Sequence, residues 1–276
     1  MPKKIVLAIP TVLGRPENEL LKTLESIFSC MDEDYRRVCC VFVLDAELKI
    51  SPYIEEVKVR FADEIAQNVL IIEKTNPNDY PHLPEDVGDG YNRWMVKQNI
   101  DFSILLERAM SLGEYVVQLD DDIRTTDNFV KYILNDISYL SYFNWIAIRV
   151  CPLGTIGAVF KSNDLPPIIN LLREKYTVMP VDLLQEKYIE MKCQKEGRFF
   201  FRIPRSLFQH VGLVSTSAAE SKKYYQIAPA NFEAFYIHDL GVGRLGCLFR
   251  PMTHLLYRLK KMIHSFEKSI NSSLSA

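Results

Sequence analysis

Short apolar runs and longer segments with helical apolar spacing alternate through the first half of the chain. The apolar runs predict strands at residues 3–10, 38–45, 68–74, 114–119 and 145–151. Apolar residues that recur every three or four positions predict helices at residues 17–30, 51–67, 94–112, 127–139 and 165–175. Strands that alternate with helices are typical of an α/β fold, so the sequence predicts a mixed, mainly parallel sheet flanked by helices.

Two stretches between these elements lack such spacing. Residues 75–90 are rich in Pro, Asn, Asp and Gly and predict a long loop, which in a compact domain is usually functional or mobile. Residues 152–157, PLGTIG, predict a turn that contains Gly154 and Gly157. After Met179 the pattern of elements is less clear.

The composition is that of an ordinary globular enzyme. Of the 276 residues 48% are hydrophobic and 25% are charged, which excludes a disordered, collagen-like or coiled-coil chain. The formal net charge is -2, so global electrostatics give no reason to expect a nucleic-acid partner. No apolar run approaches the roughly 18 residues of a membrane span, so no membrane-crossing segment is predicted.

The six cysteines predict neither a zinc site nor a disulfide framework. They form no CxxC pair and no Cys/His spacing that suits zinc. Cys39 and Cys40 are neighbours on a predicted strand, where their side chains point to opposite faces. This favours a reducing compartment, so the predicted location is cytoplasmic, with the lumen of the secretory pathway as the alternative for a trimmed secretory enzyme.

Three aspartates follow the apolar strand at residues 114–119 directly. Asp120, Asp121 and Asp122 therefore stand where ligands bind in open α/β sheets. Alternate residues of an extended chain face the same side, so Asp120 and Asp122 are expected to point together. Their oxygens suit Mn²⁺ or Mg²⁺, which could neutralise a nucleotide diphosphate. The alternative is an acidic turn that caps the next helix.

Several motifs resemble the N-acetylglucosaminyltransferase IV family. Residues 94–123, with VKQN and LDDDI, are similar to its catalytic domain, and IPTV (9–12) and PRSLFQHVGLVST (204–216) are similar to its opening strand and a late motif. Residues 152–165 and PVDLL (180–184) match more loosely, in the expected order. The resemblance implies a GT-A glycosyltransferase domain at residues 1–220, followed by a C-terminal extension at residues 221–276.

This resemblance also implies an activity. The family builds the β1,4 branch on N-glycan mannose, so the expected function is metal-dependent, inverting transfer of a sugar to a saccharide hydroxyl, with UDP-N-acetylglucosamine as the leading donor. One alternative is a sugar-nucleotide or glycan-binding protein that kept the fold and lost turnover. A nucleotidyltransferase also has acidic metal ligands, but it does not predict FQHVG or VKQN.

The resemblance assigns the metal ligands. Asp120 and Asp122 correspond to the metal-binding aspartates, and Asp121 is their partner in the triplet, with Asp120 and Asp121 also expected at the donor. The family usually has Glu-Asp-Asp, and the shorter side chain of Asp120 leaves the metal preference and the ligand set open. His210, in FQHVG, is expected to be the imidazole ligand, with a core histidine as the alternative.

Further residues are expected around the donor. Thr11 would lie by the uracil and ribose, and Lys97 and Gln98 would face the donor pocket from their helix. The alternative for Lys97 and Gln98 is a solvated polar face. Gly154 and Gly157 would let the backbone approach the sugar or acceptor, although a turn alone also explains glycines.

Inverting transfer needs one carboxylate that removes the proton of the acceptor hydroxyl. Asp182, in PVDLL, opens an apolar helical pattern where GT-A folds often supply this base. A helix N-cap is the competing role for Asp182, and Glu186 and Glu190 are weaker candidates for the base.

The C-terminal region predicts a basic amphipathic helix at residues 248–270. Such a helix could make peripheral contact with an anionic membrane surface, or it could dock on the domain.

Overall fold

The computed structural model describes residues 2–13, 17–49, 51–81 and 90–211. The chain divides into two units, Met1–Tyr236 and Ile237–Ala276, and every described residue belongs to the first. The predicted C-terminal extension at 221–276 and its helix at 248–270 therefore lie outside the described residues. Their boundary and their membrane contact stay predictions.

The core is a seven-stranded sheet with the strand order β3-β2-β1-β4-β7-β6-β8. Its strands are β1 (Lys3–Thr11), β2 (Cys39–Asp45), β3 (Leu70–Lys74), β4 (Gly113–Gln118), β6 (Trp145–Arg149), β7 (Ala158–Lys161) and β8 (Phe199–Arg202). All neighbours are parallel except β7, which runs antiparallel to β4 and to β6. A second sheet pairs β5 (Ile123–Thr125) with β9 (Phe208–His210). The predicted α/β class, with a mixed and mainly parallel sheet, is confirmed.

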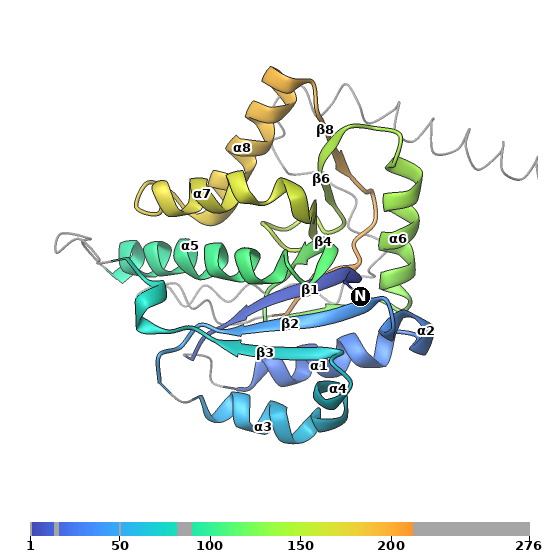
Figure 1. The fold of residues 1–276 in the computed structure, drawn as a ribbon, viewed down its shortest axis with the longest axis vertical. Coiled ribbons are helices and arrows are strands. Elements are labelled where there is room, and N and C mark those ends of the chain that lie inside the picture. Colours follow the sequence, from blue (N-terminus) through green and yellow to red (C-terminus); the bar gives the residue numbers. More distant parts are fainter. Residues whose placement is uncertain (1, 14–16, 50, 82–89, 212–276) are drawn as a thin grey trace, which may run out of the picture. The chain divides into compact units, whose positions relative to one another are not determined.

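Helices cover both faces of the large sheet (Figure 1). The helices are α1 (Glu19–Cys30), α2 (Glu33–Arg36), α3 (Pro52–Arg60), α4 (Ala62–Ala66), α5 (Gly90–Ala109), α6 (Phe129–Leu140), α7 (Pro166–Glu174) and α8 (Val181–Glu196), with short 3-10 turns η1 (Pro77–Asp79) and η2 (Ser162–Asp164). The apolar sides of α1, α3 and α6 pack on one face, and those of α5, α7 and α8 pack on the other.

The central strands are apolar on both sides because helices cover both faces. In β1, Ile5, Leu7 and Ile9 join the core under α1, whereas Val6 and Ala8 join the core under α5. Every residue of β2 is buried. Continuous apolar runs, and not alternating ones, are the pattern of such strands, which is why these runs predicted the sheet.

The predicted helix at 51–67 was wrong in one respect, because the structure divides it at Phe61 into α3 and α4. Phe61 leaves helical geometry, with φ -115° and ψ 33°. Its ring is buried and lies 5.2 Å from the ring of Phe28 on α1. Packing of this side chain against α1 therefore accompanies the break.

The glycine turn before β7 owes its glycines to backbone conformation. Gly154 has φ +46° and open space where a side chain would start, whereas Gly157 has φ +70° and is tightly enclosed. A Cβ at Gly157 would lie 3.0 Å from the Cβ of Cys151 and 3.1 Å from the ring of Phe208. The Gly157 N–H also donates to the carbonyl of Gln118 at 2.8 Å. Folding alone thus explains Gly157.

Alanine substitutions are expected to separate conformation from packing at these glycines. Gly154→Ala should lower the free energy of unfolding by roughly 1–2 kcal/mol, the penalty for a left-handed backbone. Gly157→Ala adds overpacking against Cys151 and Phe208, so its loss should reach roughly 3 kcal/mol. Urea unfolding of both variants measures the difference, and equal losses would contradict the packing explanation.

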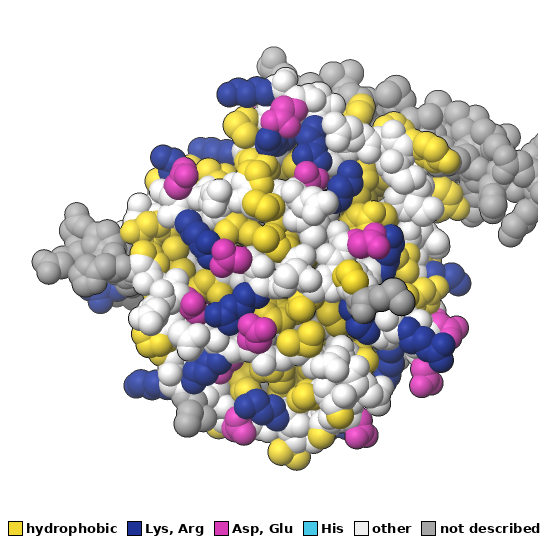
Figure 2. Space-filling model, in the orientation of Figure 1, with side chains coloured by type: hydrophobic (Ala, Val, Ile, Leu, Met, Phe, Trp, Pro, Cys, Tyr) yellow, Lys and Arg dark blue, Asp and Glu magenta, His cyan; other side chains and the backbone are white. Residues whose placement is uncertain are grey.

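Figure 2 shows basic and acidic side chains interspersed over one face of the molecule, in keeping with the small net charge. Within the described ranges, no helix combines the length and the apolar character that crossing a membrane requires.

Candidate functional site

Three parallel strands end together at the carboxyl edge of the sheet. Thr11 ends β1 and pairs in register with Asp45, which ends β2. On the other side of β1, β4 ends at Gln118, and Asp120 follows two residues later. This edge is where ligands bind in open α/β sheets, and the aspartate triplet of the chain lies there.

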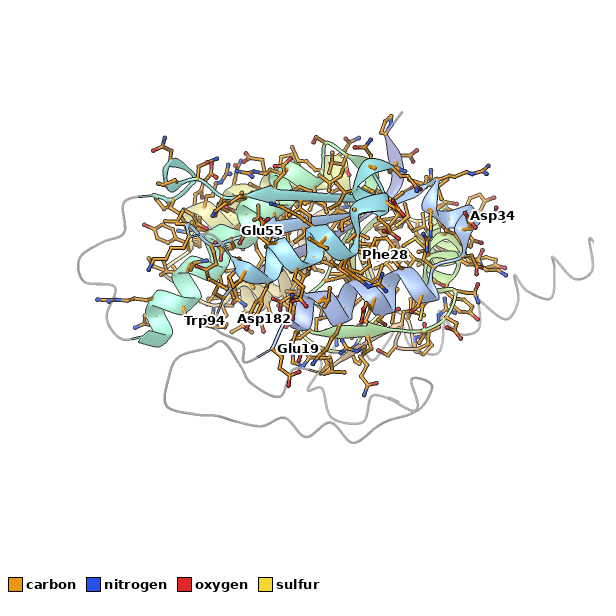
Figure 3. All side chains as sticks on the ribbon, turned by 90° about the horizontal axis from the view of Figure 1, so that it is seen from below. Glu19, Phe28, Asp34, Glu55, Trp94 and Asp182 are labelled. Carbon is orange, nitrogen blue, oxygen red and sulfur yellow. The ribbon has the colours of Figure 1, made fainter. Side chains whose placement is uncertain are left out.

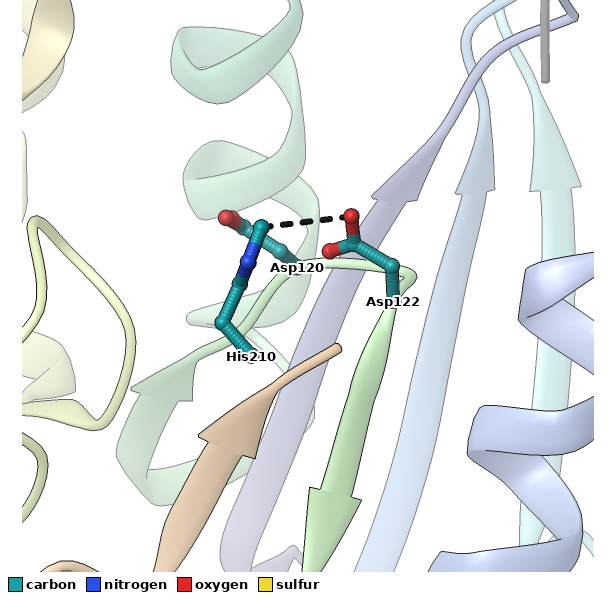
Figure 4. A group of neighbouring side chains, drawn as sticks. All are labelled: Asp120, Asp122 and His210. Carbon is teal, nitrogen blue, oxygen red and sulfur yellow. Dashed lines mark ion pairs between the residues drawn. The ribbon is translucent and has the colours of Figure 1, made fainter. Parts of the chain in front are cut away.

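Asp120, Asp122 and His210 form one cluster at this edge (Figure 4). One potential ligand atom of each residue lies within 4.8 Å of those of the other two. His210 ends β9, which pairs with β5 so that Ile123 and His210 are opposite each other. This pairing brings the His210 Nε2 to 3.2 Å from the Asp122 Oδ2. The small sheet thus unites two motifs that lie far apart in the sequence.

The backbone of the aspartate triplet is held from the neighbouring elements. The hydroxyl of Thr23 on α1 donates to the carbonyl of Asp121 at 2.8 Å, and the N–H of Ile123 donates back to that hydroxyl at 3.0 Å. The hydroxyl of Thr11 donates to the Asp121 Oδ2 at 2.8 Å. The side chain of Asp121 therefore contacts the end of β1, whereas those of Asp120 and Asp122 lie in the cluster with His210.

The cluster fits a divalent cation in its chemistry. Two carboxylates and one imidazole are a donor set that Mn²⁺ accepts well, and the carboxylates also suit Mg²⁺. The side chain of Asp122 is 1% exposed, and neighbouring carboxylates repel each other unless a positive group compensates them. The alternative of an acidic helix cap does not describe these residues, because the N-cap of α6 is Asn128.

Lys97 reaches the same edge from α5. Its Nζ donates to the carbonyl of Ala46, the residue after β2, and to the Asp101 Oδ2, each at 2.7 Å. The ammonium is therefore held at the end of β2, and the alternative of a merely solvated face is wrong for Lys97. Gln98, the next residue, is half-buried.

Asp101 and Tyr80 form a buried network that the sequence analysis missed. The Tyr80 hydroxyl donates to the Asp101 Oδ1 at 2.7 Å, while Lys97 occupies the Oδ2. Burial raises the pKa of Asp101 to about 6, and burial together with Asp101 raises the pKa of Tyr80. The four-residue spacing of Lys97 and Asp101 on a helix was the available signal. This network fixes the side chains of Lys97 and Tyr80 against Asp101.

Asp45 is a second residue that was missed. Its carboxyl is buried at the end of β2 beside Thr11, and burial raises its pKa. The available signal was an apolar strand that ends in an aspartate, as the strand before Asp120 does.

Stability is expected to fall as pH rises through the ionisation of Asp101. The pKa of the Asp101 carboxyl is about 6 in the folded protein, and its ordinary value is 3.8. The stability that the protonated carboxyl contributes is therefore present below about pH 4 and is lost as pH rises past 6. A shift of this size corresponds to on the order of 3 kcal/mol. Urea unfolding of wild type and Asp101→Asn at about pH 4 and pH 7 tests this, because the variant should gain relative to wild type at the higher pH. A difference that does not change with pH would contradict it.

Asp182 lies in the first turn of α8 (Figure 3). The predicted alternative of an N-cap is wrong, because Pro180 holds that position and Asp182 is the second residue of the helix. It is half-buried, and its Oδ1 accepts the N–H of Leu183 at 2.9 Å. Asp182 thus pairs one N–H of the first turn without being the N-cap itself, and its other carboxylate oxygen is not used in this contact.

The start of α8 lies over the carboxyl edge. The Gln185 Nε2 donates to the Oε1 of Gln118, the last residue of β4, at 2.8 Å. The Arg149 Nη1, at the end of β6, donates to the Glu186 Oε1 at 2.9 Å. Glu190 is exposed one turn further along the helix and accepts from Gln194 at 3.1 Å. Of the three candidate bases, Asp182 is nearest to the amino end of α8.

Together these features define a class of protein: an α/β protein whose sheet carries, at its carboxyl edge, a carboxylate and imidazole cluster that suits a divalent cation. A family model described as the MGAT4 conserved region matches residues 1–228, and the chain belongs to this family. The predicted relation to the N-acetylglucosaminyltransferase IV family is confirmed.

Two curated relatives illustrate the relation. The chain is 30% identical to alpha-1,3-mannosyl-glycoprotein 4-beta-N-acetylglucosaminyltransferase A of Xenopus tropicalis, over 79% of this chain and 44% of that protein. It is 31% identical to alpha-1,3-mannosyl-glycoprotein 4-beta-N-acetylglucosaminyltransferase B of Homo sapiens, over 79% of this chain and 43% of that protein. The chain spans less than half the length of these relatives.

Solved structures show more distant similarity. The mannosyltransferase PcManGT from Pyrobaculum calidifontis, in complex with GDP-Man and Mn²⁺, is 16% identical, with a TM-score of 0.45 over 74% of this chain and 57% of that chain. TarS of S. aureus, in complex with UDP-GlcNAc, is 11% identical, with a TM-score of 0.38 over 59% of this chain and 47% of that chain. Similarity at this level adds nothing to what the sheet order itself shows.

Proposed function

We propose that this protein is a metal-dependent, inverting glycosyltransferase that transfers N-acetylglucosamine from UDP-N-acetylglucosamine to a saccharide hydroxyl, such as that of mannose in a glycan. The observation that carries the proposal is the cluster of Asp120, Asp122 and His210 at the carboxyl edge of the sheet. Membership of the MGAT4 family and the names of the relatives support the donor and the acceptor class.

Asp120, Asp122 and His210 would hold the cation, Mn²⁺ or Mg²⁺. When bound, such a cation supplies positive charge that stabilises the diphosphate of the donor as it leaves. Asp121 is engaged by Thr11 and keeps the end of β1 beside the triplet.

The nucleoside end of the donor would lie at the ends of β1 and β2. Thr11 and the missed residue Asp45 are adjacent there, and Lys97 holds the backbone immediately after β2. Gln98, which follows Lys97 on α5 and is half-buried, is also proposed to face the donor. Gly154 and Gly157 form the turn that precedes β7, where their backbone is proposed to border the sugar.

Asp182 is the proposed general base. As the acceptor oxygen forms a bond to the anomeric carbon, its proton moves to the Asp182 carboxylate and the bond from that carbon to the diphosphate breaks on the opposite face. The products are the inverted glycoside and UDP. The half-buried position of Asp182 at the start of α8, over the carboxyl edge, supports this role.

A donor screen tests the proposed function. UDP release would be measured with several UDP-sugars, with and without Mn²⁺, against a panel of glycan acceptors, and the products would be analysed for the new linkage. We expect release to need both the metal and a mannose-containing acceptor, and to be fastest with UDP-N-acetylglucosamine. Binding of UDP-sugar with no product under any condition would instead identify a sugar-nucleotide-binding protein.

A further inference from the structure

The segment that leads into α8 is tied to α5 by a buried asparagine. Asn99, the last residue of VKQN, donates from its Nδ2 to the carbonyls of Tyr176 and Met179, each at 2.9 Å. Its side chain is buried, and the two carbonyls belong to the turn between α7 and α8. Asn99 therefore fixes the point from which α8 begins.

Two further anchors join the first turns of α8 to the sheet. Gln185 donates to Gln118 at 2.8 Å, and Glu186 accepts from Arg149 at 2.9 Å. Gln118 and Arg149 both pair in register with Ala158, so they occupy one row across β4, β7 and β6. The small side chain of Ala158 separates the two anchors. Three elements, α5, β4 and β6, thus hold the amino end of one helix.

These anchors leave polar atoms unpaired inside the protein. In these four side chains, the buried atoms with no hydrogen-bond partner among the described residues are the Asn99 Oδ1, the Gln118 Nε2, the Gln185 Oε1 and the Arg149 Nε and Nη2. Exchanging the oxygen and nitrogen of both glutamine amides would not change this, because one N–H group and one carbonyl would still remain. A buried polar group without a hydrogen-bond partner destabilises a fold. An apolar seam of the same shape would be more stable.

The two anchoring side chains on α8, Gln185 and Glu186, lie close to Asp182. Asp182 precedes Gln185 by three residues and Glu186 by four, so the three side chains share one face of α8. Hydrogen bonds impose a definite register between the helix and the sheet, whereas apolar side chains tolerate sliding. The polar contacts therefore lower the stability of the fold, but they fix the position of the first turns of α8.

We propose that Asn99, Gln118, Gln185 and Arg149 are positioning residues that hold the amino end of α8, and with it Asp182, at a fixed place relative to the sheet. This inference rests on the proposed function, in which Asp182 is the base. It gives the VKQN motif a role in placing α8, in addition to the role of Lys97 at the end of β2. Displacement of a reacting group by about 1 Å can lower a rate by about 10²-fold, so loss of the anchors should act on turnover.

The test replaces the glutamine pair by side chains of similar shape. In the double variant Gln118→Met, Gln185→Met we expect a melting temperature equal to or above that of wild type, because two buried unpaired atoms disappear. The kcat should fall about 10- to 100-fold. The KM for UDP-N-acetylglucosamine and the calorimetric affinity for UDP with Mn²⁺ should not change. A purely structural role would move the melting temperature and leave kcat alone.

Arg149→Met tests a second anchor independently. Its partner Glu186 is 45% exposed and also lies 3.4 Å from Arg202, so this variant leaves no buried, uncompensated carboxylate. In Arg149→Met, kcat should likewise fall while the KM for UDP-N-acetylglucosamine stays unchanged. If both this variant and the double methionine variant transfer sugar at the wild-type rate, the inference is wrong.

Two matched controls accompany these variants. Gln194→Met makes the same chemical change on the exposed face of α8 and should alter neither kcat nor stability. Arg198→Met breaks an ion pair with Asp164 at the opposite edge of the sheet, and it should lower the melting temperature without changing kcat. A loss of kcat in Arg198→Met equal to that of the anchor variants would point to general destabilisation and would overturn the inference.

A double-mutant cycle separates this inference from the proposed function. If the anchors act through Asp182, adding Asp182→Asn to the double methionine variant should lower kcat little beyond Asp182→Asn alone. Fully additive losses would overturn the inference while leaving the base in place. Absence of any transfer by wild type would instead refute the proposed function, and the inference with it.

Discussion

Asp122→Asn is expected to abolish Mn²⁺-dependent binding of UDP while the protein stays folded. The Asp122 carboxylate is buried in the cluster with Asp120 and His210, so it supplies a charged ligand that the amide cannot replace. The substitution keeps the size of the side chain, which protects the packing around β5. Calorimetric titration with UDP in the presence of Mn²⁺, together with a melting curve, measures both parts of this prediction.

Two comparisons sharpen the result. His210→Ala should weaken UDP binding less than Asp122→Asn does, because water can replace one neutral ligand. Asp34→Asn removes an exposed carboxylate on α2 and should leave the affinity unchanged. Wild-type affinity for UDP and Mn²⁺ in Asp122→Asn would refute the metal assignment.

Asp182→Asn is expected to lower turnover by about 10²–10⁴-fold, the usual contribution of a positioned general base. Donor and metal affinity should remain, because Asp182 lies in the first turn of α8 and outside the cation cluster. Stability should change little, because Pro180 and not Asp182 is the N-cap and because Asn keeps an oxygen that can accept the N–H of Leu183. The measurement is the transfer rate at saturating UDP-N-acetylglucosamine, with a melting curve of the same preparation.

Glu190→Gln is the matched control, since it neutralises an exposed carboxylate further along the same helix. It should transfer sugar at the wild-type rate. If Asp182→Asn also transfers at a near-normal rate, the base lies elsewhere, and Glu186 is the next residue to test. Glu186 is the less suitable candidate because its Oε1 lies 2.9 Å from Arg149 and 3.4 Å from Arg202.

Local pattern predicted the sheet and the acidic site well for a definite reason. Strands buried on both faces must be apolar throughout, and β1, β2 and β4 accordingly correspond to the predicted apolar runs. An aspartate that follows such a strand must lie at the carboxyl edge, whatever the rest of the fold does. The position of Asp120 was therefore predictable from its neighbours in the chain.

Motif resemblance supplied what local pattern could not. Nothing in the residues around His210 indicates that its imidazole lies 3.2 Å from Asp122. Only the pairing of β5 with β9 brings the two together. Likeness to the FQHVG motif of the family predicted His210 as a metal ligand, and the structure places its imidazole in one cluster with Asp120 and Asp122.

Residues after Met179 were not predictable because their order depends on distant partners. The helix α8 takes its place from hydrogen bonds to Asn99, Gln118 and Arg149, which lie between 37 and 80 residues away from their partners. Its own apolar pattern is weak, since charged and apolar residues alternate irregularly along it. The alternative of an N-cap at Asp182 was wrong because the helix begins at Val181, two residues earlier than an N-cap at Asp182 would require.

By itself, the sequence determined the α/β class, the main strands and the acidic carboxyl edge, because burial and strand direction follow from short-range pattern. Only the tertiary structure decided the antiparallel insertion of β7, the break at Phe61 and the polar seam under α8. It also decided that Asp45 adjoins Thr11 and that Asp101 holds Lys97. These features depend on which surfaces pack against each other, and hydrogen bonds and ring contacts between distant residues set that packing once the chain has folded.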